Sequence, residues 1–201
     1  MTTTSSEINV DIGQWLNRGW DLIATELGNF ILLTLVFLAI NIAAVSTGIG
    51  IIFLLGPTSV GYFYIVLQKI RGKSVYIGDI AKGFHVFVAS MLSAIVVYIF
   101  VMIGLFFLII PGIIVMALYL FVFPLIIEKK MDFWTAMETS RKLVMKNLFE
   151  FSVFTLVLCI IGGVGALLFG VGLLLALPLI FSAIALAYVD MFGLENESAV
   201  K

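Results

Sequence analysis

Few residues of this chain have the chemistry that catalysis or metal binding requires. There is a single histidine, His85, and a single cysteine, Cys159, which lies in an apolar run where a thiol is a poor nucleophile. The glycine-rich run at 162–165 lacks the lysine of a phosphate-binding loop. No acid and base can be paired for nucleophilic catalysis. We therefore expect no catalytic, cofactor-binding or metal-ligating residue and no enzymatic activity.

Polar side chains inside the long apolar stretches are the next candidates, because an ionisable group in a membrane interior marks a functional site. These stretches contain no Asp, Glu, Lys or Arg and only mild polar groups such as Asn41, Tyr98 and Tyr119. An asparagine in this setting typically forms a hydrogen bond between helices. Proton- or ion-coupled transport normally needs a buried carboxylate, so the sequence disfavours that class.

Charge placement predicts how the chain is organised. The 201 residues are 63% hydrophobic and 11% charged, whereas a soluble domain is about 25% charged. The Asp, Glu, Lys and Arg residues are confined to four windows, at 7–26, 69–82, 128–150 and 190–201. The three charge-free stretches between them lie at 27–68, 83–127 and 151–189. A helix crosses a bilayer in about 20 residues, so each stretch is long enough to cross twice.

The sequence thus predicts an all-α membrane protein with six transmembrane helices, arranged as three helical hairpins. The hairpin turns are expected at 46–50, at Pro111-Gly112 and in the glycine-rich region 162–172. The predicted spans are 29–47, 50–68, 89–110, 113–127, 151–169 and 171–189. We expect a single domain over 1–201, built from units 6–74, 75–130 and 131–194, with flexible termini at 1–5 and 195–201.

Cationic residues predict the orientation. All 11 Lys and Arg residues lie in the termini or between the hairpins, and none lies at a hairpin tip. Loops rich in Lys and Arg stay in the cytoplasm. We therefore expect a multi-pass protein of the cell (inner or plasma) membrane with both termini cytoplasmic. Residues 1–10 show no cleavable signal peptide.

An amphipathic segment on the cytoplasmic side precedes each hairpin. The first segment has an apolar stripe that includes Trp15, Gly19 and Ile23, and the second and third lie near 77–88 and 132–148. All three tryptophans, Trp15, Trp20 and Trp134, lie in these segments. Such segments either bury their apolar face at the lipid headgroup boundary or pack on the bundle as ordinary loop helices.

Three cations of the third segment, Arg141, Lys142 and Lys146, lie close together in sequence. A basic residue near an anionic membrane surface contributes about 1 kcal/mol. We therefore predict that these residues contact anionic lipid. Their alternative role is to enforce orientation only.

Two further patterns concern helix packing. Pro57, Pro124 and Pro178 recur in the second helix of each unit and predict kinks, which neighbouring helices tolerate in a membrane. Small residues recur every four positions along the fifth span, at Gly162, Ala166 and Gly170. This spacing lets backbones approach closely, either to the sixth span or to another subunit.

Several short motifs carry a family resemblance. The chain has IPGII at 110–114, FPLIIE at 123–128, AMETSR at 136–141 and MKN at 145–147. This order resembles a group of uncharacterised prokaryotic six-helix membrane proteins, which includes domains of unknown function and the membrane domain found beside some glycerophosphodiester phosphodiesterases. The resemblance covers roughly residues 50–193 and departs at Thr135, where an acid is usual. It implies the six-helix fold more than an activity.

The missing chemistry, the small-residue packing and the amphipathic segments favour a non-enzymatic membrane scaffold or accessory subunit. Its expected partners are membrane lipids, other membrane proteins or further copies of the chain, with no nucleic acid and no cofactor. The alternative is a small-solute transporter or channel with a cavity among Pro-kinked helices. A third class, an enzyme acting on lipid, lacks an acid–base pair. A water-accessible cavity lined by Asn41, Tyr98 or Tyr119 would favour transport.

Overall fold

The computed structural model describes residues 10–168 and 170–194, which contain helices and no strand, as predicted for an all-α protein. The flexibility expected of residues 1–5 and 195–201 concerns positions outside the described residues. The α-helices are α1 (Ile12–Ala24), α2 (Leu27–Ser46), α3 (Gly50–Ile70), α4 (Phe87–Phe107), α5 (Ile109–Leu118), α6 (Val122–Lys129), α7 (Phe133–Val144), α8 (Leu148–Leu167) and α9 (Leu173–Phe192). Two 3₁₀-helices, η1 (Ile77–Val86) and η2 (Met145–Asn147), precede α4 and α8.

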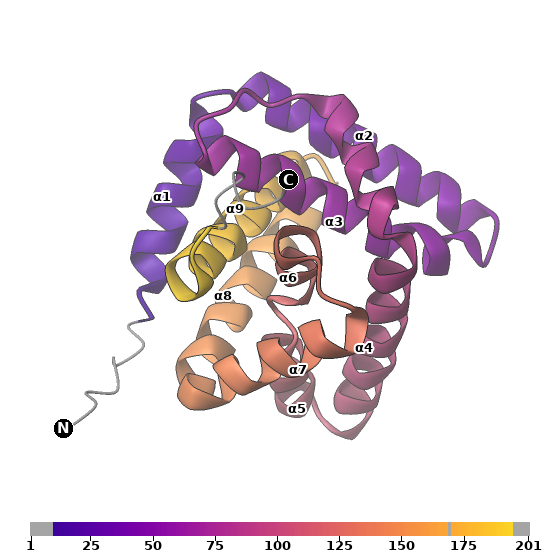
Figure 1. The fold of residues 1–201 in the computed structure, drawn as a ribbon, viewed down its shortest axis with the longest axis vertical. Helices are drawn as coiled ribbons and strands as arrows, with labels where there is room; N and C mark the ends of the chain where they lie inside the picture. The colour runs from indigo at the N-terminus through magenta and orange to yellow at the C-terminus, as the bar shows by residue number, and fades with distance from the viewer. Residues whose placement is uncertain (1–9, 169, 195–201) are drawn as a thin grey trace.

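Six helical segments of the described chain are long and apolar enough to span a membrane, which confirms the predicted number. They are Leu27–Ser46, Gly50–Ile70, Ile77–Phe107, Ile109–Lys129, Phe133–Leu167 and Leu173–Phe192. Consecutive helices contact each other within the pairs α2–α3, α4–α5 and α8–α9. In Figure 1, α6 and α9 lie near the middle of the view, with α1, α2, α4, α7 and α8 around them.

The second half of α3 is buried among α4, α6, α9 and η1, because small side chains let their backbones come close. A Cβ atom on Gly61 would overlap the carbonyl of Ile80, and one on Gly83 would overlap the carbonyl of Pro57. Only glycine leaves room for such a backbone contact. These two glycines therefore fix η1 across α3 and set where α4 begins.

The fourth predicted span is two helices rather than one. α5 ends at Leu118 and α6 begins at Val122, with a turn at 119–121 between them. The break before α5 lies at Leu108, where the backbone is extended (φ −173°, ψ 160°), and not at Pro111-Gly112. Pro111 lies in the first turn of α5, where the missing N–H of a proline leaves no helical hydrogen bond unmade.

Two of the three prolines lie inside continuous helices. Pro57 is inside α3 and Pro178 is inside α9, and each removes one backbone hydrogen bond from its helix. Pro124 lies in the first turn of α6, directly after the turn at 119–121. At Pro124 the structure therefore has a break and a new helix start in place of the predicted kink.

The apolar stripe of the first amphipathic segment contacts protein. Trp15, Gly19 and Ile23 are buried, and α1 packs along α9. A Cβ atom on Gly19 would lie 3.3 Å from the backbone nitrogen of Ala183. Of the two alternatives for this segment, the structure therefore shows packing on the bundle and not burial in lipid headgroups. Trp134 of the third segment, by contrast, is 61% exposed.

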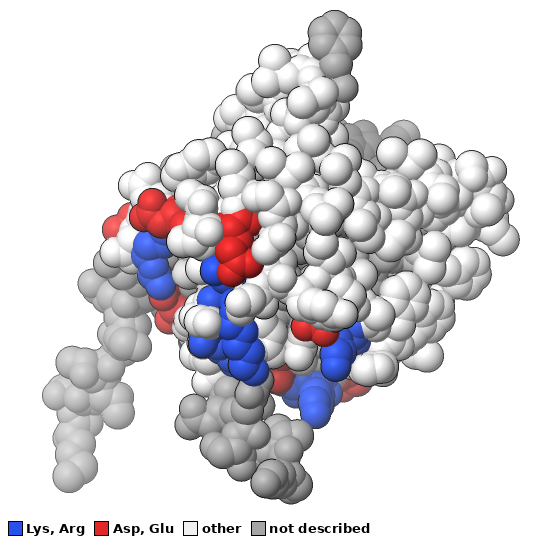
Figure 2. Space-filling model, turned by 90° about the horizontal axis from the view of Figure 1, so that it is seen from above, with Lys and Arg blue, Asp and Glu red and all other residues white. Residues whose placement is uncertain are grey.

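Charged residues form groups on the molecular surface. Figure 2 shows Lys, Arg, Asp and Glu grouped on part of the visible face, while the rest of that face is uncharged. Three ion pairs join helices that are distant in sequence. The pairs are Arg18–Asp190 (3.0 Å) between α1 and α9, Lys69–Glu26 (2.6 Å) at the ends of α3 and α2, and Arg71–Glu128 at the ends of α3 and α6.

The close contact between α8 and α9 does not follow the predicted small-residue stripe. A Cβ atom on Gly165 would lie only 2.8 Å from the Cβ atom of Ala176. Ala166 is exposed, Gly170 lies in the turn after α8 with φ +77°, and Gly162 has room for a methyl group in ordinary contact with Ile180. Gly165 is therefore the glycine of α8 with the least room toward α9, and contact of the stripe with another subunit stays a prediction.

Candidate functional site

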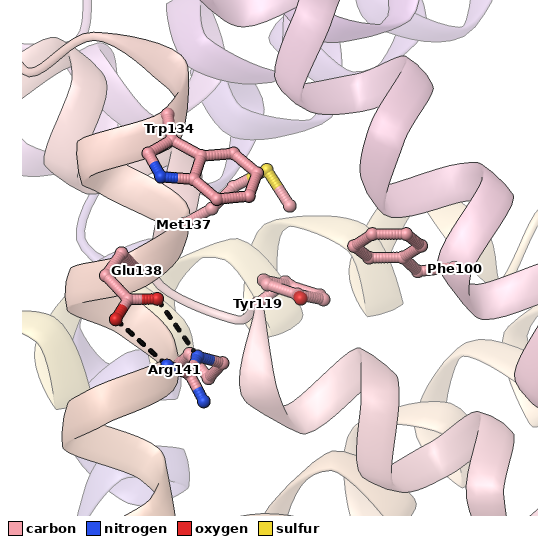
Figure 3. Close-up of a pocket in the computed structure, with 6 residues that line it drawn as sticks. All are labelled: Phe100, Tyr119, Trp134, Met137, Glu138 and Arg141. Atoms are coloured by element: carbon pink, nitrogen blue, oxygen red, sulfur yellow. Dashed lines mark hydrogen bonds and ion pairs between the residues drawn. The ribbon is translucent and has the colours of Figure 1, made fainter.

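A crevice of about 260 Å³ opens where α4, the turn at 119–121 and α7 meet. Figure 3 shows Tyr119 lying between Phe100 and an ion pair on α7, with two further side chains of α7 above it. The lining residues are Phe100, Tyr119, Trp134, Met137, Glu138 and Arg141. The crevice thus joins aromatic and apolar walls to charged groups on one helix.

The turn that presents Tyr119 is held by Ser140, a buried residue of α7. The Ser140 hydroxyl donates a hydrogen bond to the carbonyl oxygen of Leu118 (2.8 Å) and accepts one from the backbone N–H of Phe121 (3.2 Å). Helix ends leave backbone groups without partners inside the helix. One side chain therefore satisfies a group at the end of α5 and another at the start of α6, and so stabilises the break.

Aromatic rings form two sides of the crevice. The rings of Tyr119 and Phe100 have their centroids 5.8 Å apart at 34°. Asp132 caps α7 and orients its first turn, where its carboxylate accepts the backbone N–H groups of Trp134 (3.0 Å) and Thr135 (3.1 Å). The hydroxyl and the backbone N–H of Thr135 lower the pKa of Asp132, because both stabilise the carboxylate. The cap thereby places the exposed indole of Trp134 at the opening.

The charged edge of the crevice is a carboxylate shared by two cations. Arg141 contacts Glu138 through Nε (3.1 Å) and Nη2 (2.9 Å), and the Nζ atom of Lys142 lies 3.3 Å from the same carboxylate. These side chains are between 33% and 69% exposed. Exposed ion pairs contribute little to the stability of the fold, because solvent screens them. The pair therefore orients the guanidinium more than it stabilises the protein.

Hydrogen-bond donors around the crevice outnumber free acceptors. Neither the Tyr119 hydroxyl nor the Trp134 indole N–H is hydrogen-bonded within 10–168 and 170–194. Arg141 has five N–H donors and uses three of them, two on Glu138 and one on the sulfur of Met145 (3.5 Å). The Glu138 carboxylate already accepts from both cations. The arrangement suits a ligand that is negatively charged and rich in acceptor oxygens.

The structure brings together two of the three cations predicted to contact lipid. Arg141 and Lys142 share Glu138 at the crevice, whereas Lys146 lies in η2, is exposed and forms no ion pair with a described residue. Phe100 could not be associated with the site from the sequence, because it lies on α4, far away in the chain. Ser140 was not predicted either, although it lies in the AMETSR motif beside Arg141.

The three polar residues proposed for a transport pathway lie in three different surroundings. Asn41 is buried and donates hydrogen bonds to the Phe37 carbonyl (2.8 Å) and the Thr58 hydroxyl (3.2 Å). Tyr98 is 61% exposed on α4. Tyr119 lines the crevice at the junction with α7. They therefore do not form one path.

A second polar cluster lies where α2 begins. The Glu26 carboxylate contacts Lys69 (2.6 Å) and accepts hydrogen bonds from Asn29 (2.9 Å) and from the backbone N–H of Val75 (3.1 Å). The ion pair with Lys69, followed by the hydrogen bond from Asn29, lowers the pKa of Glu26 from 4.5 to about 2. This cluster joins α2, α3 and the segment before η1, which is a structural role.

No group of His, Cys, Asp and Glu residues suited to a metal ion occurs at positions 10–168 and 170–194. Comparisons with protein-family models, with curated proteins and with solved structures found no match to this chain. The resemblance of the 110–147 motifs to six-helix prokaryotic membrane proteins therefore stays a prediction.

Proposed function

We propose that the protein is a non-enzymatic scaffold or accessory subunit of the cell membrane that interacts with lipids or with partner proteins. The observation that carries this proposal is the use of buried polar groups for packing. The hydroxyls of Thr34 and Tyr62 are 2.8 Å apart, and Asn41 is hydrogen-bonded to Thr58. These contacts connect α2 to α3. Polar groups that form hydrogen bonds between helices are not free to line a path for a solute.

The six segments then form three hairpins, with both termini on the cytoplasmic side. This orientation is supported by the positions of the basic residues, because the 11 Lys and Arg residues all lie outside the apolar stretches. It is also supported by the grouping of charges on one part of the face that Figure 2 shows. Arg141 and Lys142 belong to the third charged segment, which this orientation puts on the cytoplasmic side.

The proposal is tested by two measurements on the full chain. Purification in mild detergent, followed by mass spectrometry, should recover specific lipids or partner proteins. Proteoliposomes containing the pure protein should be no more permeable to small solutes than liposomes without it. Solute flux above the protein-free control would contradict the proposal and favour the transporter alternative.

A further inference from the structure

From the crevice geometry we infer a binding site for the phosphodiester headgroup of an anionic phospholipid, of the phosphatidylglycerol class. This inference rests on the proposed function and names the lipid that the protein would hold. The site comprises Tyr119, Trp134 and Arg141 of the crevice, with Glu138 as the positioning residue of the guanidinium. Lys142, which contacts the same carboxylate, lies beside it.

The net charge of the cluster favours an anionic lipid. Arg141 and Lys142 share the single carboxylate of Glu138, so the cluster keeps one net positive charge. A lipid with one negative charge balances it, and a zwitterionic lipid would leave its own ammonium beside two cations. Because the guanidinium is held by two contacts to Glu138, it is oriented before the ligand arrives, which lowers the entropic cost of binding.

The hydrogen-bond donors around the crevice suit a phosphodiester group. Two N–H groups of Arg141, the Tyr119 hydroxyl and the Trp134 indole N–H are available around a volume of about 260 Å³. A phosphodiester offers two charged non-bridging oxygens, and arginine suits planar, paired recognition of such groups. Tryptophan is typical of the membrane–water interface, because its ring is largely apolar and its N–H needs a partner.

An acyl chain has a continuous apolar surface to follow. Phe100 forms the wall of the crevice, and Ile103 and Phe107 lie one and two turns further along α4, with 38%, 50% and 71% of their surfaces exposed. A second hollow, at the end of α4, is lined by the apolar side chains of Met102, Ile103, Leu105, Phe106 and Phe107. The headgroup site therefore continues directly into the lipid-facing side of α4, as a phospholipid requires and a free phosphate does not.

The test is a titration of the full-length protein in mild detergent with phosphatidylglycerol or phosphatidylethanolamine of identical acyl chains, read by native mass spectrometry. Wild type should bind phosphatidylglycerol more tightly. Arg141→Gln should lower that affinity about tenfold, since it removes charged hydrogen bonds, and Tyr119→Phe roughly two- to tenfold. Inorganic phosphate should not displace the lipid.

The matched control is Lys82→Gln, which removes one exposed cation from a different element and should leave lipid binding unchanged. Equal affinity for the two lipids, or equal losses in Arg141→Gln and Lys82→Gln, would overturn the inference. If Arg141→Gln does not fold, Tyr119→Phe decides, because it keeps the ring and removes only the hydroxyl. Lipid binding that survives both crevice variants refutes the site and leaves the proposed function standing, whereas solute flux refutes the proposed function alone.

Discussion

The hydroxyl of Ser140 on α7 accepts a hydrogen bond from the backbone N–H of Phe121 at 3.2 Å, across the break in the fourth membrane segment. The same hydroxyl donates to the carbonyl of Leu118. α7 thereby holds both ends of the turn that carries Tyr119 into the crevice. The shape of the candidate lipid site depends on this one side chain.

Replacing Ser140 by Ala should therefore destabilise the protein by about 1–3 kcal/mol, because two backbone groups lose their partner in a buried position. The measurement is thermal unfolding in detergent. Ser152→Ala is the matched control, since the Ser152 hydroxyl bonds only to the Leu148 carbonyl within its own helix (2.7 Å). Equal stability of the two variants would show that Ser140 does not hold the break.

The α8–α9 contact gives a second prediction. Gly165→Ala should lower the stability by about 1–3 kcal/mol, because the added methyl meets Ala176 and the backbone of Gly172. Ala166→Leu should change the stability of the monomer by less than about 0.5 kcal/mol, because Ala166 is exposed. A greater loss from Ala166→Leu than from Gly165→Ala would contradict this packing. Loss of self-association in Ala166→Leu alone would instead reveal a subunit contact of the stripe.

Stability should also depend on the pH through Glu26. Its pKa is lowered from 4.5 to about 2 in the folded protein, so its ion pair with Lys69 stabilises fully above about pH 4.5 and is lost as the pH falls toward 2. Thermal unfolding between pH 6 and pH 3 should show a smaller loss for Glu26→Gln than for wild type. Identical slopes in wild type and Glu26→Gln would contradict the role of Glu26.

The sequence predicted the membrane segments well because their signal is local. Charge-free stretches with a break near the middle are enough to place two crossings each, and six segments are found. The orientation and the hairpin arrangement rest on the same distribution of charged residues, and they stay predictions.

Features that depend on distant residues could not be predicted. From the sequence, Trp15 is typical of a membrane interface. In the structure its indole N–H donates a hydrogen bond to Asp190 on α9 (2.7 Å), 175 positions away in the chain. The break before Pro124 needs Ser140 from another helix to satisfy its backbone groups. Gly165 could not be predicted from the small-residue spacing, because spacing alone does not say which side of a helix faces its neighbour.

We propose that the chain crosses the membrane six times and keeps its charged segments in the cytoplasm. Single cysteines in a Cys159→Ser background, labelled in intact cells with a membrane-impermeant reagent, test this topology most directly. Gly48→Cys, Leu108→Cys and Val171→Cys should be labelled from outside, because they lie in the turns opposite the charged segments. Lys73→Cys and Met131→Cys should be labelled only after the cells are opened. Labelling of position 73 or 131 in intact cells would contradict the account.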